Sequence, residues 1–237
     1  MHQVIGFVSG KGGMGKTALC AAIATALAQR GKRVLCIDCD SGPGDLAHYL
    51  GIAEAQNLTY AEICRGHYPL EQATAHPHWS GLRFLAAPMT SQRVEPEAFA
   101  ALLEQARQRF DHILLDSPDL SADVSQWLLV THGDPAAVRG ARLLADGLEV
   151  AGAGEVRLLV NAIEPKELSG LDLTVDDIID QVGLPLLGIL PRDPAVKFAA
   201  AQAEPLLLYT KKGAAAAVQR ITDRLLDIRT PIPGRIK

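Results

Sequence analysis

A glycine-rich stretch near the start of the chain, residues 9–17 with the sequence SGKGGMGKT, constrains the fold more than any other feature. It follows an apolar run at residues 4–8 and precedes a helix-prone run at residues 18–29. Strand, glycine-rich turn and helix form the context in which the pattern GxxxxGK(S/T) binds phosphate. The glycines let backbone N–H groups surround an anion, and the helix N-terminus adds the positive end of its dipole. The sequence therefore predicts a nucleotide-binding protein.

The residue types within this loop indicate how it holds a nucleotide. Lys16 places a positive charge near the β- and γ-phosphates, and the Thr17 hydroxyl is a ligand for Mg²⁺. The loop residues that we expect to bind the nucleotide are Gly10, Gly12, Gly13, Met14, Gly15, Lys16, Thr17 and Ala18.

A second lysine, Lys11, lies inside the loop, where an ordinary phosphate loop carries almost any residue. The resulting pattern, GKGGxGKT, resembles the deviant Walker A motif of the MinD/ParA family of dimerising P-loop ATPases, and is closest to its MinD branch. The resemblance covers nearly the whole chain, most strongly residues 3–46 and most weakly 50–110. In that family the extra lysine reaches across a dimer interface to the partner's nucleotide. The resemblance therefore implies ATP or ADP with Mg²⁺, a homodimer with ATP, and this role for Lys11; the alternative is a solvated surface lysine.

The rest of the sequence predicts one α/β domain, residues 1–237, which is long enough to bury one large core. Short continuous apolar runs, typical of buried parallel strands, alternate with helical patterns. We expect a doubly wound, mostly parallel sheet of about seven strands with helices on both faces, the P-loop NTPase fold. The expected strands are residues 4–8, 34–37, 82–86, 112–116, 127–130, 156–161 and 186–190.

Carboxylates follow two of these strands, at the sheet edge where magnesium and the attacking water must be held. Asp38 and Asp40 come after the second expected strand, and Asp116 ends the fourth. The resemblance implies that Asp40 orients or activates the hydrolytic water, that Asp38 supports the magnesium shell and that Asp116 holds the metal through water. Loop capping by these aspartates is the alternative. Residues 42–44 (GPG) indicate a loop that changes shape with the nucleotide state.

The segment after Asp116 departs from the family. Ser117 and Pro118 resemble its second switch, but the usual glycine and crossover helix are missing, and the next strand begins near Trp127. A parallel connection normally takes a dozen or more residues. About nine extended residues still span roughly 30 Å, so we expect a return with little or no helix. Relatives bind regulators through this surface, and the sequence leaves that role open here.

Two later strand ends complete the expected nucleotide site. Asn161 resembles the residue that contacts adenine in relatives, and an amide can pair with the N6/N7 edge of that base. Pro191 and Arg192 follow the last expected strand, where the backbone of relatives closes the other side of the base pocket.

Cysteine and histidine spacing does not indicate a metal site. Cys36 and Cys39 look like a CxxC pair, but residues three apart on a strand point to opposite faces, so we expect small buried side chains. His67, His76 and His78 lie in a stretch broken by prolines and fit no zinc pattern. We expect these three histidines at the surface.

Composition limits the partners. A net charge of −4 argues against a globally basic nucleic-acid binder. The chain has no run of about 18 apolar residues and no signal-peptide pattern at its start, so we expect a cytoplasmic protein. The helix expected at residues 213–228 has an apolar side suited to the core, and the prolines and glycine after it oppose an amphipathic membrane helix. A peripheral position on the inner membrane face stays open, without a visible anchor.

The function that we expect is a MinD-type switch that binds ATP, hydrolyses it slowly and dimerises, for spatial organisation such as division-site selection. Lys11, Lys16 and Asp40 are its expected catalytic residues, and a regulatory protein is an expected partner. One alternative is a ParA-type DNA-partition ATPase, but only Lys211, Lys212 and the last arginines offer a basic patch, so nucleic acid is disfavoured. The others are a metabolic phosphotransfer enzyme and a nucleotide-binding adaptor with little hydrolysis.

Overall fold

The computed structural model describes residues 3–40, 44–53, 57–88 and 94–232. Two sequence predictions fall outside these residues: the shape change assigned to residues 42 and 43, and the basic end of the chain at residues 233–237. Within the described part, every helix is too short or too polar to cross a lipid bilayer.

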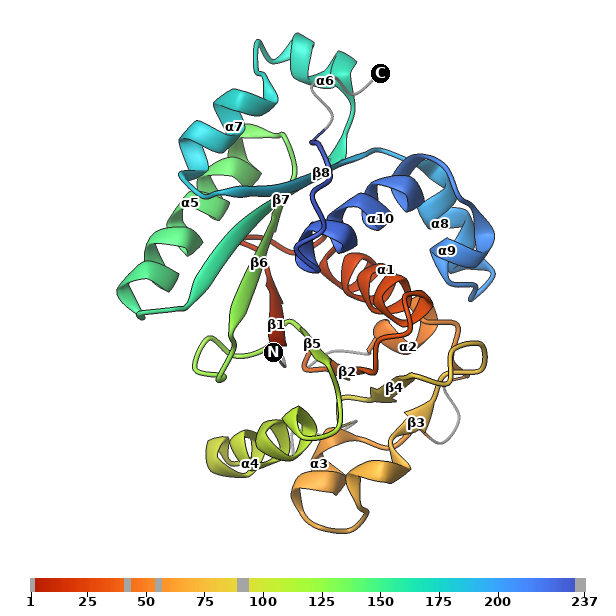
Figure 1. Ribbon diagram of the computed structural model, residues 1–237. Coiled ribbons are helices and arrows are strands. Elements are labelled where there is room, and N and C mark those ends of the chain that lie inside the picture. The colour runs from red at the N-terminus through yellow and green to blue at the C-terminus, as the bar shows by residue number, and fades with distance from the viewer. Residues whose placement is uncertain (1–2, 41–43, 54–56, 89–93, 233–237) are drawn as a thin grey trace.

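A single sheet of eight strands runs through the described part of the molecule (Figure 1). The strand order is β3-β4-β2-β5-β1-β6-β7-β8, and every pair of neighbours is parallel except β3 and β4. The strands are β1 (Gln3–Val8), β2 (Val34–Asp38), β3 (Thr74–Ala75), β4 (Leu82–Leu85), β5 (His112–Asp116), β6 (Gln126–Thr131), β7 (Glu155–Ile163) and β8 (Leu186–Pro191). The seven predicted strands are present and the doubly wound α/β prediction is confirmed; the short β3 is the addition.

Helices cover both faces of the sheet (Figure 1). On one face lie α1 (Lys16–Gln29), α2 (Leu46–Tyr49), α8 (Pro194–Ala201), α9 (Leu206–Tyr209) and α10 (Gly213–Leu225). On the other lie α3 (Tyr60–Cys64), the 3₁₀ turn η1 (Leu70–Gln72), α4 (Pro96–Arg107), α5 (Pro135–Val150), α6 (Pro165–Gly170) and α7 (Val175–Val182).

Three short helices, α6, α8 and α9, were not predicted. A local signal for α8 was present, because Asp193 precedes Pro194 and its carboxylate accepts a hydrogen bond from the N–H of Ala195 at 2.9 Å. Aspartate before a proline at the first helical position is typical of a helix start.

The strand side chains alternate between two cores. On β1, Ile5 and Phe7 pack in the core under α1 and α10, whereas Val4 and Val8 pack in the core under α4 and α5. Because both faces of the sheet are covered, the strands appear in the sequence as continuous apolar runs. This double burial holds the carboxyl ends of β1, β2 and β5 side by side, where the predicted site lies.

The cysteines follow the same alternation. Cys36 packs in the first core, with its Sγ 3.7 Å from that of Cys20, whereas Cys39 packs against the second core and is half-buried. All of these thiols are free. The predicted opposite orientation is confirmed, and the expectation of full burial holds for Cys36.

The link between β5 and β6 contains no helix, as predicted. Ser117 has a positive φ of 54° and its N–H donates to the carbonyl of Phe7, so the chain turns sharply at the end of β5. Ser125 then donates its N–H to the carbonyl of Val4 before β6 pairs with β1. The short return is therefore held by hydrogen bonds to β1.

Two surface and core predictions were wrong. His76 is only 4% exposed, because its Nε2–H donates to the carbonyl of Leu50 at 2.7 Å and its Nδ1 accepts the N–H of His78 at 3.1 Å. The last helix ends at Leu225, and Ile228 is 52% exposed instead of lying in the core. The His76 error concerns a tertiary contact that no local pattern reveals, whereas the helix ends at a local turn in which Asp227 has a φ of 58°.

His76 should make the fold sensitive to acid. Burial lowers the pKa of His76 to about 4, below the ordinary value near 6.5, although the bond to Leu50 opposes this shift. The unfolded chain therefore binds more protons, and stability is lost as pH falls from about 6.5 toward 4. We expect this group to remove about 1–2 kcal/mol of unfolding free energy between about pH 7 and pH 5. Urea unfolding at both pH values should show a smaller acid loss for His76→Gln, and an unchanged loss for the exposed control His67→Gln. Equal acid losses in wild type and His76→Gln would contradict this assignment.

Candidate functional site

The phosphate loop lies between the carboxyl end of β1 and the first turn of α1. Gly15 is the N-cap residue of α1, with φ 85° in the left-handed region that glycine favours. In the described residues, Leu19 is the first residue of α1 whose N–H bonds back into the loop, to the carbonyl of Gly15 at 3.0 Å. The N–H groups of Lys16 and Thr17 thus remain available to an anion, as the predicted phosphate site requires.

The loop also rests on α5 through two glycines. A Cβ on Gly10 would lie 2.2 Å from the carbonyl carbon and oxygen of Gly140, so only glycine fits there. A Cβ on Gly12 would meet nothing within 4 Å. Sequence reasoning missed Gly140, although an isolated glycine inside a helical pattern is a signal of close packing.

Two predicted carboxylates meet beside the loop. Asp38 and Asp116 lie at neighbouring positions of β2 and β5, and both are almost fully buried. Burial raises the pKa of Asp116 to about 6, while the nearby Thr17 hydroxyl and the charge of Lys16 oppose the shift.

The segment after β2 holds the second carboxylate in place. Asp38 Oδ1 accepts the N–H of Asp40 at 3.1 Å, and a Cβ on Gly44 would lie 2.3 Å from Asp38 Oδ2. Burial raises the pKa of Asp38 to about 7; the Asp40 N–H lowers it, and the charge of Asp116 raises it further. Asp40 itself is exposed at the mouth of the site, on the side open to solvent.

The donor set suits a magnesium ion that also binds phosphate. Neither Asp38 nor Asp116 forms an ion pair with lysine or arginine among the described residues. In that part of the chain no three His, Cys, Asp or Glu side chains converge to hold a metal by themselves. Mg²⁺ is usually held by one or two carboxylates together with nucleotide phosphates and water. Asp116, Asp38 and the Thr17 hydroxyl supply hard oxygen atoms of that kind.

The base side of the site is formed by the ends of β6, β7 and β8. Asn161 is half-buried, and its Nδ2–H donates to the carbonyl of Met14 at 2.9 Å. Arg192 donates its backbone N–H to the carbonyl of Ile163 at 2.9 Å, and its guanidinium pairs with Glu167 at 2.8 Å. Pro191 is half-buried at the end of β8.

His132, which sequence reasoning did not select, completes this side. Burial lowers the pKa of His132. The charge of Asp134 opposes this shift, and the Met14 backbone opposes it to a smaller extent. A cavity of about 80 Å³ is lined by residues that include His132, Asp134, Glu167 and Arg192. The only sequence signal for His132 was its place directly after a predicted strand.

Lys11 lies on the exposed rim of the loop, where the Ser9 hydroxyl donates to its carbonyl at 2.6 Å. The predicted loop residues therefore come together with the carboxylates and with Asn161 at one edge of the sheet. Lys11 is exposed to solvent, as are Gly10, Gly12 and Gly13.

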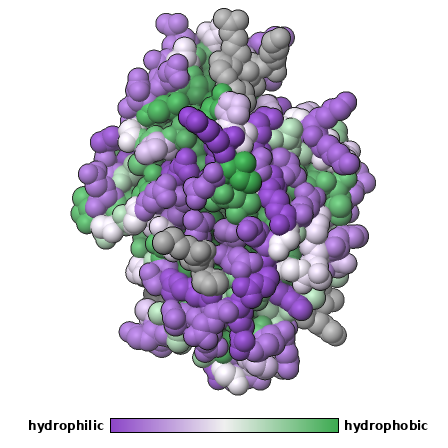
Figure 2. All heavy atoms as spheres, viewed as in Figure 1, coloured by the Kyte–Doolittle hydropathy of each residue, from purple (hydrophilic) through white to green (hydrophobic). Residues whose placement is uncertain are grey.

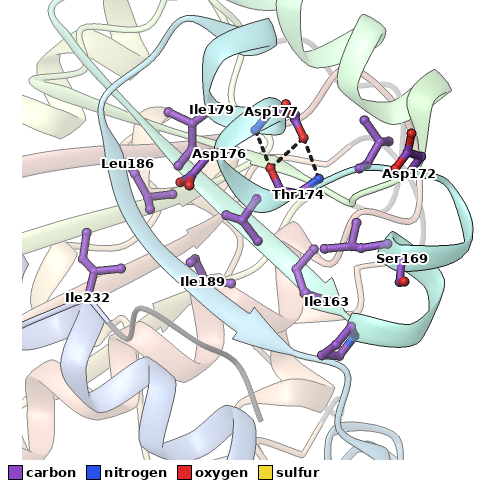
Figure 3. Close-up of a pocket in the computed structure, with 14 residues that line it drawn as sticks. Ile163, Ser169, Asp172, Thr174, Asp176, Asp177, Ile179, Leu186, Ile189 and Ile232 are labelled. Carbon is purple, nitrogen blue, oxygen red and sulfur yellow. Dashed lines mark hydrogen bonds between the residues drawn. The ribbon is translucent and has the colours of Figure 1, made fainter.

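A larger cavity of about 650 Å³ lies elsewhere, between β7, β8, α6 and α7 (Figure 3). Its walls are mainly aliphatic and include Ile189 and Ile232, and Asp177 at its rim is held by Thr174 in a capping box. Figure 2 shows hydrophobic side chains gathered over this part of the surface. None of its lining residues belongs to the phosphate loop.

Comparison with known proteins agrees with this geometry. Residues 5–206 match the model of the CobQ/CobB/MinD/ParA nucleotide binding domain. The chain belongs to this family. It is 30% identical to the septum site-determining protein MinD of Synechocystis, over 95% of this chain and 90% of that protein. It is 30% identical to MinD of Bacillus subtilis, over 98% and 92% respectively.

Solved structures of the family have the same architecture. The MinC:MinD cell division protein complex of Aquifex aeolicus superposes with a TM-score of 0.89 and 28% identity, over 97% of this chain and 98% of that one. MinD of Pyrococcus horikoshii, solved with Mg-ADP, gives a TM-score of 0.83 over 95% of this chain and 96% of that one, at 24% identity. The predicted P-loop NTPase fold and MinD/ParA membership are both confirmed.

The two loop glycines should differ in their effect on stability. Gly10→Ala forces a Cβ against the backbone of Gly140, so we expect it to lower the free energy of unfolding by about 1–3 kcal/mol. Gly12→Ala, in open space, should change it by less than about 0.5 kcal/mol. Urea unfolding without nucleotide measures both. A tolerated alanine at position 10 would show that the contact with α5 is not tight.

Proposed function

We propose that this protein is a Mg²⁺-dependent ATPase that binds ATP, hydrolyses it slowly and dimerises in the ATP state, as a switch of the MinD type. The observation that carries the proposal is the pair of buried carboxylates Asp116 and Asp38 on neighbouring strands, with Thr17 of the first turn of α1 beside Asp116. In that position one hydroxyl and one carboxylate reach the place where the metal of a bound nucleotide must lie. Membership of the MinD/ParA family supports the same assignment.

The residues of the site divide the work. Bound Mg-ATP supplies the phosphoryl group and the charge that makes its transfer to water feasible. The free N–H groups of Lys16 and Thr17, with the Lys16 ammonium, hold the phosphates. Asp116 and Asp38, neighbours on β5 and β2, would hold the Mg²⁺ of the nucleotide, and exposed Asp40 would orient the attacking water. Asn161 and the backbone of Pro191 and Arg192 enclose the base.

Dimerisation is assigned to Lys11. Its exposed position on the rim of the loop leaves it free to reach the phosphates of a nucleotide in a second copy. An ammonium that neutralises phosphate across an interface makes association depend on the bound nucleotide. Residues 1–237 then act as one ATPase domain.

The cellular role that we propose is spatial organisation, such as selection of the division site. Its support is the likeness to septum site-determining proteins over nearly the whole chain. A regulatory protein is the proposed partner, since one similar structure is a MinC:MinD complex. The protein is proposed to work in the cytoplasm and at the inner face of the membrane.

Lys11→Ala should weaken ATP-dependent dimerisation while leaving nucleotide binding intact. Losing one charge-assisted contact of about 1.5–3 kcal/mol weakens association by about 10- to 100-fold. Light scattering after size exclusion, with ATP and with ADP, measures the effect, and Lys32→Ala is a matched control at the far end of α1. A normal ATP-dependent dimer in Lys11→Ala would refute the cross-subunit role.

Asp40→Ala should retain ATP and slow its hydrolysis by at least about 100-fold, because the water loses its orienting carboxylate. Phosphate release under saturating ATP measures the rate. The ATP-held variant can then be sedimented with anionic liposomes, with the ADP form as the control. Sedimentation with ATP alone supports a membrane role; a dimer that stays in solution would remove the membrane from the proposal.

A further inference from the structure

Two side chains from outside the phosphate loop lie near the carbonyl of Met14. Asn161, from β7, donates its Nδ2–H to this oxygen at 2.9 Å. His132, directly after β6, also lies close enough to the Met14 backbone for that backbone to raise the pKa of its imidazole. A Cβ on Gly15 would lie 2.5 Å from Asn161 Nδ2, so glycine is needed for the amide to approach. The contact between Asn161 and the Met14 carbonyl therefore depends on the amide of β7 and on the glycine at position 15 of the loop.

This contact determines the direction of the next N–H group. The peptide unit between Met14 and Gly15 is planar and trans, so its C=O and N–H point in opposite directions. With the Met14 oxygen held toward Asn161, the Gly15 N–H points away from Asn161. Gly15 directly precedes Lys16 and Thr17, whose N–H groups begin α1 without intrahelical partners.

We propose that Asn161 is a positioning residue for the phosphate loop, which holds the Met14–Gly15 peptide so that the Gly15 N–H faces the bound phosphates. The inference rests on the proposed nucleotide function and adds a task for Asn161 beyond contact with the base. Its Nδ2 has a second hydrogen, and its Oδ1 is an acceptor, so the same amide can still meet adenine. Base recognition and phosphate binding are then coupled through one side chain.

His132 supports the same peptide from the neighbouring strand end. Both side chains approach the Met14 carbonyl from the ends of β6 and β7, which are adjacent parallel strands. The loop backbone thus depends on strands that follow it by more than a hundred residues in the sequence. Without these donors the peptide is free to rotate, and an anion site loses one of its N–H groups.

The test uses a ligand that has no base. Inorganic tripolyphosphate with Mg²⁺ competes against a fluorescent ADP analogue for wild-type protein, Asn161→Leu, Asn161→Ala and Asn161→Gln. Asn161→Leu and Asn161→Ala lack the donor, whereas Asn161→Gln keeps an amide N–H. Thermal unfolding confirms that each variant is folded, and the two variants without a donor guard against one of them failing to fold.

We expect Asn161→Leu and Asn161→Ala to weaken tripolyphosphate binding by about 5- to 10-fold, the value of one hydrogen bond, and to weaken the ADP analogue by at least that factor. Asn161→Gln should recover most of the affinity for tripolyphosphate. A loss confined to the ADP analogue would overturn the inference, because Asn161 would then serve the base alone. Equal losses in Asn161→Gln and Asn161→Leu would overturn it as well, since the donor would not matter. If wild-type protein binds neither ligand, the proposed function itself is refuted.

Discussion

The N–H groups at the start of α1 have no partners in the helix, and the rest of the site is arranged around the positive end that they form. β1 delivers the chain to this point, Gly10 lies against Gly140 of α5, and Asn161 holds the Met14 carbonyl. The loop around this helix end is exposed or half-buried, so a bound anion can reach these N–H groups from solvent. The double burial of the sheet supplies the rigidity that keeps these parts in register.

The two carboxylates near this helix end are buried at an electrostatic cost. Asp38 and Asp116 are buried side by side on neighbouring strands, and burial raises the pKa of both. Two neighbouring desolvated carboxylates repel each other, and a divalent cation beside them would offset that repulsion. Under the proposed function, binding of Mg²⁺ with nucleotide would therefore stabilise the fold.

Prediction from sequence succeeded for features that depend on neighbouring residues in the chain, such as buried strands and short links. Continuous apolar runs identified seven of the eight strands, and the short link at residues 117–125 was correctly expected to lack a helix. It failed where a contact depends on distant segments: His76 was placed at the surface, although it bonds to the Leu50 carbonyl and is buried. It also extended the last helix to residue 228, although the helix ends at Leu225 and the chain turns at Asp227. The sequence did not indicate that His132 and Gly140 lie against the phosphate loop, because that loop is far from both residues in the sequence.

By itself the sequence determined the phosphate loop, the order of strands and helices, and the acidic groups at two strand ends. These features follow from glycine spacing, apolar periodicity and residue type, which are local properties. Only the tertiary structure decided which glycines have no room for a side chain, which aspartates lose their water and which amide holds the loop. Those properties depend on the strand order that places β5 and β6 on either side of β1, with β7 beyond β6. Burial and hydrogen bonding across that sheet arise only when the segments meet.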